Sequence, residues 1–175
     1  MDLERIEEWQ IPKATHAAIR QLLGQAFPHY PDRSYYQQVP SFRLLARQQE
    51  QLIGHVAVTF RVINAGGEPF SVFGLGDVCV HPDFQNRKVG SQLLQYLTEL
   101  GQLHGIDFLV LIAADHALYL ANGFVLVENV CRWQVIKQQA SFGIRQGRLP
   151  DSVLVKALTD KVWPEGLIDF LGSMF

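Results

Sequence analysis

A polar loop between an apolar strand and a helix carries residues suited to binding an anion. The apolar run that ends at Val80 gives way to the sequence HPDFQNRKVGS, which leads into a helical pattern. A helix N-terminus offers unpaired N–H groups and the positive end of the helix dipole, and Arg87 and Lys88 add formal positive charge. This combination is typical of a pyrophosphate-binding loop, although many ordinary strand-to-helix connections also contain a glycine and two basic residues.

Two familiar nucleotide-binding loops do not fit this sequence. A P-loop needs a second glycine followed by Lys-Ser or Lys-Thr, which is absent. The GLG at 74–76 lies before or within the preceding strand, whereas a dinucleotide-binding fingerprint follows its strand. The sequence therefore supports neither of these nucleotide-binding folds.

A few titratable side chains are candidates for acid–base chemistry. Asp77 is a carboxylate inside an apolar strand, where an unpaired charge is costly, so it is the first candidate for a general base. A pairing role at a strand kink is an equal alternative. His81 and His116 are reserve candidates because the ordinary pKa of histidine lies near neutrality, although a surface or capping role is more common. No metal site is expected, because neither cysteine has a second Cys or His at ligand spacing.

The elements that must position these residues follow from the hydrophobic pattern. Strands are predicted at 3–9, 42–48, 52–63, 70–80, 106–114, 124–130, 131–137 and 152–158, and helices at 14–27, 89–104 and 115–122. Asp115 is expected to cap the last of these helices. The fully apolar strand at 106–114 indicates burial on both faces, beside a parallel neighbour reached through the helix at 89–104.

Length and composition set the broad class. A chain of 175 residues with 48% hydrophobic composition is enough for one domain with a real core. The longest apolar runs are about half of the roughly 20 residues that a transmembrane helix needs, and the start of the chain lacks a secretory signal pattern, which favours the cytoplasm. Fifteen basic and seventeen acidic residues without a run of like charge argue against nucleic acid as a partner and favour a small molecule.

Two segments resemble a known family. VHPDFQNRKVGSQLL is similar to the acyl-CoA loop of the GCN5-related N-acetyltransferase (GNAT) superfamily, whose pattern is Gln/Arg-x-x-Gly-x-Gly/Ala after a strand ending in Val-x-Pro. Gln85 fills its first position and Gly90 its last, whereas Lys88 stands at the first glycine. LYLANGF is similar to the family's Phe-Tyr-x-x-x-Gly-Phe segment, with Tyr119 four residues before Gly123. The resemblance covers roughly 44–135.

The resemblance implies a fold and a reaction. It implies one GNAT domain over 1–175, with a CoA-binding core at about 44–135 and a C-terminal strand and tail at 150–175. The implied fold is α+β, a mixed sheet of about six to seven strands flanked by about four helices, with splayed central parallel strands. Acetyl-CoA is the implied co-substrate, without a metal, and its acetyl group passes by direct attack to a primary amine of a small molecule.

The resemblance also implies roles for particular residues. Tyr119 matches the family's acid, which protonates the departing thiolate, while Asp77 stays the candidate base. Packing of Tyr119 against the sheet is the alternative. The residues expected to pair with the pantetheine arm or hold the pyrophosphate are Cys79, Val80, Gln85, Arg87, Lys88, Val89, Gly90 and Ser91.

Within the superfamily, the hairpin and the tail most resemble the aminoglycoside 2'-N-acetyltransferases and the nodulation-type N-acyltransferases. In that group the acidic residue of the fourth strand falls at the position of Gly76, which weakens Asp77 as a transferred base. Tyr30, Trp163 and Asp169 are expected to face the amine, which Trp163 could stack on and Asp169 could neutralise. A plain apolar tail that closes the sheet is an equal alternative.

Two other functions stay open. One is an N-acyltransferase that uses a longer acyl donor, and the other is a non-catalytic CoA-binding sensor or interaction module. Lys88 in place of glycine favours the sensor slightly, whereas Tyr119 argues against it. Neither nucleic acid nor a membrane is expected as a partner, and a homodimer stays open.

Overall fold

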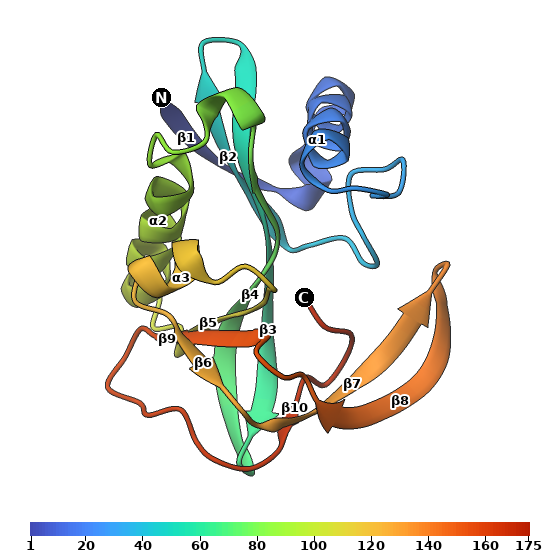
Figure 1. Cartoon of the computed structure of the whole chain (residues 1–175), viewed down its shortest axis with the longest axis vertical. Coiled ribbons are helices and arrows are strands. Elements are labelled where there is room, and N and C mark those ends of the chain that lie inside the picture. The colour runs from blue at the N-terminus through green and yellow to red at the C-terminus, as the bar shows by residue number, and fades with distance from the viewer. The chain divides into compact units, whose positions relative to one another are not determined.

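The computed structural model describes all 175 residues, which form two compact units. Unit 1 comprises Met1–Val58 and Gly76–Tyr96, and unit 2 comprises Thr59–Leu75 and Leu97–Phe175. Three elements, labelled in Figure 1, contribute a part to each unit: β3 (Gln51–Ala65), β4 (Glu68–Val80) and α2 (Val89–Leu103). The division expected from the sequence, one domain over 1–175, stays a prediction.

Unit 1 combines antiparallel strands with one long helix. β1 (Asp2–Glu7) pairs with β2 (Phe42–Gln48), and β2 pairs in turn with the first part of β3. A 3-10 helix, η1 (Glu8–Gln10), and α1 (Lys13–Ala26) follow β1. The apolar positions of α1 fall at helical spacing, so they share one face. That face is buried in the core of unit 1, with Ile11, Ile19, Leu22, Leu23, Leu45, Leu52 and Cys79.

A glycine on β3 lets the beginning of α2 come close to the strand. A Cβ atom placed on Gly54 would lie 2.9 Å from Cγ1 of Val89 and 3.0 Å from Cδ1 of Leu93. Only glycine leaves the space for this contact, because any other side chain would force the helix to shift. The position of the first turn of α2 is therefore set by packing against β3.

Unit 2 contains the parallel pair of strands that the sequence predicts. Its strand order is β6-β9-β5-β4-β3-β10-β7-β8. β4 pairs in parallel with β5 (Phe108–Ile112), from Val72 opposite Phe108 to Leu75 opposite Leu111. The other elements of this unit are α3 (Ala117–Ala121), β6 (Val125–Val127), β7 (Val130–Lys137), β8 (Ala140–Arg148), β9 (Val153–Ala157) and β10 (Ile168–Asp169).

The core of unit 2 forms around aromatic side chains. Phe70 and Trp163 each meet the ring of Phe108 edge-on, at centroid distances of 5.3 and 5.0 Å. Offset or edge-on packing is the arrangement that aromatic quadrupoles favour. The C-terminal residues 168–175 join this core through Ile168 and Phe170, both fully buried. The tail therefore closes the core of its own unit, as the apolar alternative expects.

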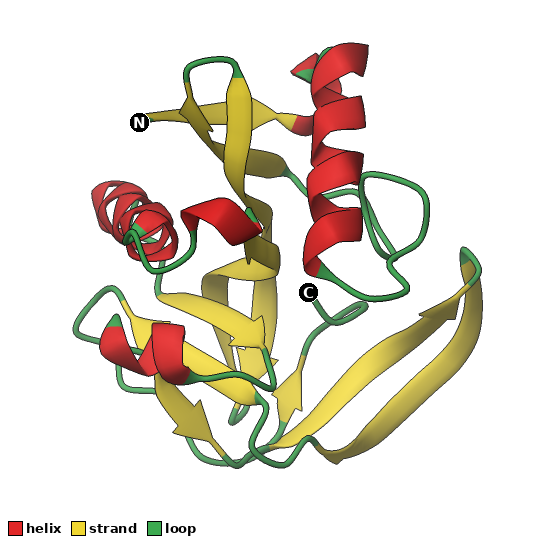
Figure 2. Ribbon diagram, turned by 45° about the horizontal axis from the view of Figure 1, so that its top comes forward, coloured by secondary structure: helices red, strands yellow, loops and turns green.

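The predicted α+β class with a mixed sheet is confirmed, and Figure 2 shows strands in yellow with few helices in red. The structure has ten strands instead of six or seven, and three α-helices instead of about four. The predicted strand at 3–9 ends at Glu7, where η1 begins. Asp115 accepts a hydrogen bond from the N–H of Ala117 at 3.2 Å but precedes the N-cap residue of α3, His116, by one position. No helix is long and apolar enough to cross a membrane.

Candidate active site

The strand-to-helix loop of unit 1 has the backbone path of an anion-binding loop. After β4 ends, η2 (Pro82–Phe84) turns the chain, and Asn86 and Lys88 both have left-handed backbones, with φ of 60° and 64°. The carbonyl of Lys88 accepts a hydrogen bond from the N–H of Gln92 at 3.0 Å, so α2 begins directly after it. The N–H groups of a first helical turn have no acceptor within the helix and attract an anion.

Lys88 occupies the glycine position of the loop and adopts the conformation that glycine prefers. A left-handed backbone costs a non-glycine residue about 1–2 kcal/mol, whereas glycine adopts it freely. The side chain of Lys88 is exposed, while its backbone has the left-handed φ of 64°. The contact of Lys88 with phosphate stays a prediction.

We expect Lys88→Gly to raise the free energy of unfolding by about 0.5–1 kcal/mol, because the left-handed strain disappears while glycine adds unfolded-state entropy. The dissociation constant for CoA should stay level or fall. Urea denaturation and calorimetric titration of CoA measure the two effects. Asn86→Gly is the matched control, since Asn86 is left-handed but uncharged. A more than tenfold loss of CoA affinity in the Lys88 variant alone would show that the ammonium group binds phosphate.

The other predicted CoA contacts divide into exposed and buried groups. Gln85 and Arg87 are exposed, and the Arg87 guanidinium lies 5.2 Å from the ring centre of Phe84. Val89 and Gly90 are buried in the first turn of α2, and Ser91 is partly buried. Within β4, Cys79 is buried and Val80 is partly buried. This part of unit 1 thus presents cationic side chains at its surface and helix N–H groups beside them.

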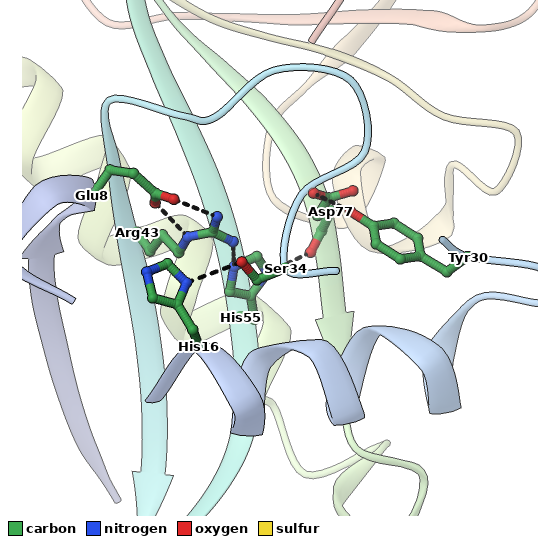
Figure 3. A network of polar contacts seen from close by, with 7 residues as sticks. All are labelled: Glu8, His16, Tyr30, Ser34, Arg43, His55 and Asp77. Atoms are coloured by element: carbon green, nitrogen blue, oxygen red, sulfur yellow. Dashed lines mark hydrogen bonds and ion pairs between the residues drawn. The ribbon is translucent and has the colours of Figure 1, made fainter. Parts of the chain in front are cut away.

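Asp77 combines an unusual backbone with a hydrogen-bonded carboxylate. It lies inside β4, yet its φ is 51°, which is typical of a residue that interrupts a strand ladder. Its Oδ2 accepts a hydrogen bond from the Tyr30 hydroxyl at 2.8 Å (Figure 3). Burial raises the pKa of the Asp77 carboxyl, while the Tyr30 hydrogen bond and the charge of Arg43 oppose this rise. A raised pKa makes this carboxylate a better proton acceptor than an ordinary aspartate.

Tyr30 stays protonated beside this carboxylate. Burial and the nearby charge of Asp77 both raise the pKa of the Tyr30 hydroxyl far above its ordinary value. The ring centres of Phe27 and Tyr36 each lie 5.9 Å from that of Tyr30, and Tyr36 is 56% exposed. The structure thus brings together two predicted site residues, Asp77 and Tyr30, with an aromatic wall beside them.

A chain of buried polar groups approaches Asp77 from the opposite side, as Figure 3 shows. Nε and Nη2 of Arg43 donate to the two carboxylate oxygens of Glu8 at 2.7 and 3.0 Å. Nη1 of Arg43 lies 3.0 Å from Nε2 of His55, and Nδ1 of His55 lies 2.9 Å from the Asp77 carbonyl oxygen. Arg43 and His55 are fully buried. These contacts link η1, β2, β3 and β4 of unit 1.

The sequence reasoning did not single out Arg43, His55 or Glu8. Arg43 and His55 sit in the apolar runs FRLLARQ and LIGHVAV, where a charged or titratable side chain needs a partner. Arg43 and His55 thus show the same feature in the sequence as Asp77, a charged or titratable side chain within an apolar run. Their pairing depends on strand register, in which Ala57 lies opposite Arg43, and a single sequence does not fix that register.

Tyr119, the predicted acid, lies on α3 in unit 2. It is 8% exposed, and its ring meets Phe124 edge-on at 5.8 Å. Gly123 follows with a φ of 82°, the left-handed conformation that lets the chain leave the helix. The packing expected of a helix tyrosine is present, and the role of Tyr119 as an acid stays a prediction.

The two tail residues predicted to face the amine have partners within unit 2. Nε1 of Trp163 donates to Oδ1 of Asn129 at 3.0 Å, and the indole lines a pocket of about 580 Å³. Oδ2 of Asp169 accepts from Arg132 at 3.3 Å, and its Oδ1 accepts from the N–H of Leu171 at 3.0 Å. These contacts account for both side chains structurally, and their contact with a substrate stays a prediction.

The two reserve histidines both make hydrogen bonds to the backbone. Nδ1 of His81 accepts from the N–H of Asp83 at 3.3 Å, and Nε2 of His116 donates to the carbonyl of Asp151 at 2.6 Å. His81 thus stabilises its own turn, and His116 links the start of α3 to the turn before β9. No group of three or more His, Cys, Asp or Glu side chains is arranged to hold a metal ion.

Comparisons with known proteins show the family of this chain. The model of the acetyltransferase (GNAT) domain family matches residues 10–127. No curated protein sequence gives a significant match. The solved structures that resemble this chain include the GNAT family N-acetyltransferase YhbS of Escherichia coli in complex with CoA, at 21% identity, with 96% of this chain and 88% of that chain covered and a TM-score of 0.66.

Two further structures show the same fold. A GNAT family acetyltransferase of Brucella melitensis in complex with acetyl-CoA is 20% identical over 95% of this chain and 94% of that chain, with a TM-score of 0.60. The ribosomal-protein-S18-alanine N-acetyltransferase of E. coli is 15% identical over 92% of this chain and 97% of that chain, with a TM-score of 0.61. Because the family model matches more than half of the sequence, the chain belongs to the GNAT acetyltransferase family, and the expected enzyme class, an acyltransferase, is confirmed.

Proposed function

We propose that this protein transfers an acetyl group from acetyl-CoA to a primary amine of a small molecule, by direct attack while both substrates are bound. The observation that carries the proposal is the Asp77 carboxylate, held by Tyr30 and raised in pKa by burial, in the same unit as the loop that opens α2. An amine is protonated at neutral pH and must lose a proton before it can attack. A partly buried carboxylate is suited to that task.

The proposed reaction proceeds in three steps. Asp77 removes a proton from the bound ammonium group, and the amine nitrogen forms a bond to the thioester carbonyl carbon. The carbon–sulfur bond then breaks and the nitrogen loses its second proton to solvent, which yields the neutral amide and the CoA thiolate. Tyr119 gives its hydroxyl proton to the thiolate, and solvent later takes the proton from Asp77 and restores the Tyr119 hydroxyl. The first turn of α2 contributes by holding the pyrophosphate, which places the thioester for attack.

The acceptor we propose is a cationic, aminoglycoside-like amine. The exposed ring of Tyr36 beside Tyr30 and the carboxylate of Asp77 together suit a cation, because aromatic faces and carboxylates both attract positive charge. The resemblance of the hairpin and the tail to the aminoglycoside 2'-N-acetyltransferases supports the same class. Charge at the site therefore favours a polyamine sugar over a neutral or acidic acceptor.

One experiment tests this function and separates it from the two alternatives. Calorimetry measures the binding of acetyl-CoA, longer acyl-CoAs and free CoA, and thiol release is then followed with aminoglycosides, polyamines and amino-terminal peptides. We expect acetyl-CoA to bind and thiol release to be fastest with aminoglycosides. Faster turnover of a longer acyl-CoA would point to an N-acyltransferase, and binding without turnover on any amine would point to a sensor. Absence of CoA binding would overturn the proposal.

Tyr119→Phe tests the proposed acid. We expect the variant to lower the rate of thiol release by about 10²-fold, because phenylalanine keeps the ring packing against Phe124 but has no proton to donate. The dissociation constant for CoA should change less than about twofold. Calorimetry and thiol detection measure the two quantities on the same preparation. An equal loss of rate and affinity would mean that Tyr119 has a structural role.

A further inference from the structure

The buried polar chain of unit 1 ends on a backbone atom, the carbonyl oxygen of Asp77. Burying the guanidinium of Arg43 costs free energy because the group loses its hydration, and hydrogen bonds to its partners must offset this cost. Glu8 accepts two hydrogen bonds from Arg43 and His55 accepts a third, so each nitrogen of the buried guanidinium has a partner. The role of this chain should therefore be sought at the Asp77 carbonyl oxygen, where the chain ends.

The protonation state of His55 follows from the chemistry of its neighbour. A guanidinium only donates hydrogen bonds, so Nε2 of His55, 3.0 Å from Nη1 of Arg43, must be the acceptor. Nδ1 therefore carries the proton and donates it to the Asp77 carbonyl at 2.9 Å. Burial and the positive charge of Arg43 lower the pKa of His55 to about 3, so the ring stays neutral at physiological pH and this tautomer persists.

The group that receives this hydrogen bond has a strained backbone. Asp77 is left-handed inside β4, at a cost of about 1–2 kcal/mol for a residue other than glycine, and such strain persists only when its surroundings impose it. The N–H of His55 fixes the direction of the Asp77 carbonyl and hence of the peptide that follows. Since a residue's backbone determines where its side chain starts, the same bond constrains the carboxylate that Tyr30 holds from the other end.

We propose that His55 is a positioning residue, which Glu8 and Arg43 hold in one tautomer so that it fixes the left-handed backbone of Asp77 and aims its carboxylate. The catalytic consequence rests on the proposed function, in which Asp77 is the base. The structural consequence, a fixed conformation at Asp77, does not depend on it. The charged groups around His55 are Arg43 and Glu8 on one side and Asp77 on the other, and Tyr30 faces the Asp77 carboxylate.

Two amide variants separate the two hydrogen bonds of the ring. The amide nitrogen of His55→Asn lies near the position of Nδ1 and can still donate to the Asp77 carbonyl. The amide of His55→Gln reaches the position of Nε2 and can still accept from Arg43, but it leaves the Asp77 carbonyl without its donor. If His55 positions Asp77, kcat should fall by about 10²-fold in the Gln variant and by less than about tenfold in the Asn variant. The KM for acetyl-CoA should stay within about twofold in both.

A second readout needs no turnover. The 13Cα and carboxyl 13C shifts of Asp77, assigned through Asp77→Asn, report its backbone conformation and its titration. We expect the Asn variant to keep the wild-type shifts and the Gln variant to lose the left-handed signature, with the carboxyl titrating nearer its ordinary value. Wild-type shifts in both variants would overturn the positioning role, as would equal changes in both. If the shifts behave as expected while no amine is acetylated in any variant, the proposed function fails and the positioning role stands.

Discussion

Asp77→Asn is expected to lower kcat/KM for the amine by about 10²- to 10⁴-fold, the usual contribution of a positioned general base. Asparagine keeps the size of the side chain and can still accept the Tyr30 hydrogen bond, but it cannot take up a proton at neutral pH. It also tolerates a left-handed backbone well, so the φ of 51° at this position should persist. The measurement is thiol release at varied amine concentration.

A matched control comes from a second aspartate in the same backbone conformation. Asp151 has a φ of 49° and is exposed in the turn before β9, and its carbonyl accepts a hydrogen bond from His116. Asp151→Asn changes the same chemical group on the same kind of backbone away from Asp77, and its kcat/KM should equal that of the wild type. If both variants keep wild-type rates, Asp77 is not the base.

The pH dependence of kcat/KM tests whether Asp77 acts as the base. The base is active only when deprotonated, so kcat/KM should fall as the pH drops through the pKa of Asp77. Burial raises this pKa from its ordinary value of 3.8, which moves the acid limb of the profile toward neutral pH. The limb should disappear from the residual activity of Asp77→Asn. A limb that persists unchanged would assign it to another group.

The sequence predicted the parts of the site that depend on local patterns. The loop after β4 and the helix that follows it are neighbours in the chain, so a local pattern, together with its resemblance to the GNAT loop, predicted an anion-binding loop at 85–91. The left-handed backbone of Lys88 could not be predicted, because a lysine does not indicate this conformation in a sequence. Asp77 and Tyr30 were each selected from the sequence, but their hydrogen bond joins residues 47 positions apart, and no local pattern encodes such a distance.

The fold shows the same limit. The strands of the central core were predicted because burial gives them apolar runs, as in FLVLI of β5. β8 was not predicted because apolar and polar residues alternate only over its first half, ASFGIR, and two glycines interrupt the segment; almost all of its residues are exposed. It becomes a strand by pairing with β7 along most of its length, from Val130 opposite Arg148 to Lys137 opposite Ala140. β10 is two residues long, too short for any periodic signal.

Arg43→Met is expected to lower the free energy of unfolding by about 3–5 kcal/mol, the usual cost of removing one partner from a buried ion pair. Methionine fills much of the same volume, but it leaves the carboxylate of Glu8 without its partner and Nε2 of His55 without a donor. Since the free energy of unfolding of a native protein is only about 5–15 kcal/mol, this single change removes a large part of the stability. Urea denaturation followed by circular dichroism measures it.

Arg47→Met is the matched control on the same strand. Arg47 lies four residues further along β2, partly exposed, with Nε 3.4 Å from the Glu4 carboxylate, and such surface pairs contribute about 0–1 kcal/mol. The double variant Glu8→Gln with Arg43→Met adds a second test. It also removes the unpaired charge of Glu8, so its free energy of unfolding should be higher than that of Arg43→Met alone. If Arg43→Met costs no more than Arg47→Met, the buried chain does not hold unit 1 together. The tautomer of His55 would then depend on the Asp77 carbonyl, which only accepts a hydrogen bond and so favours the proton on Nδ1.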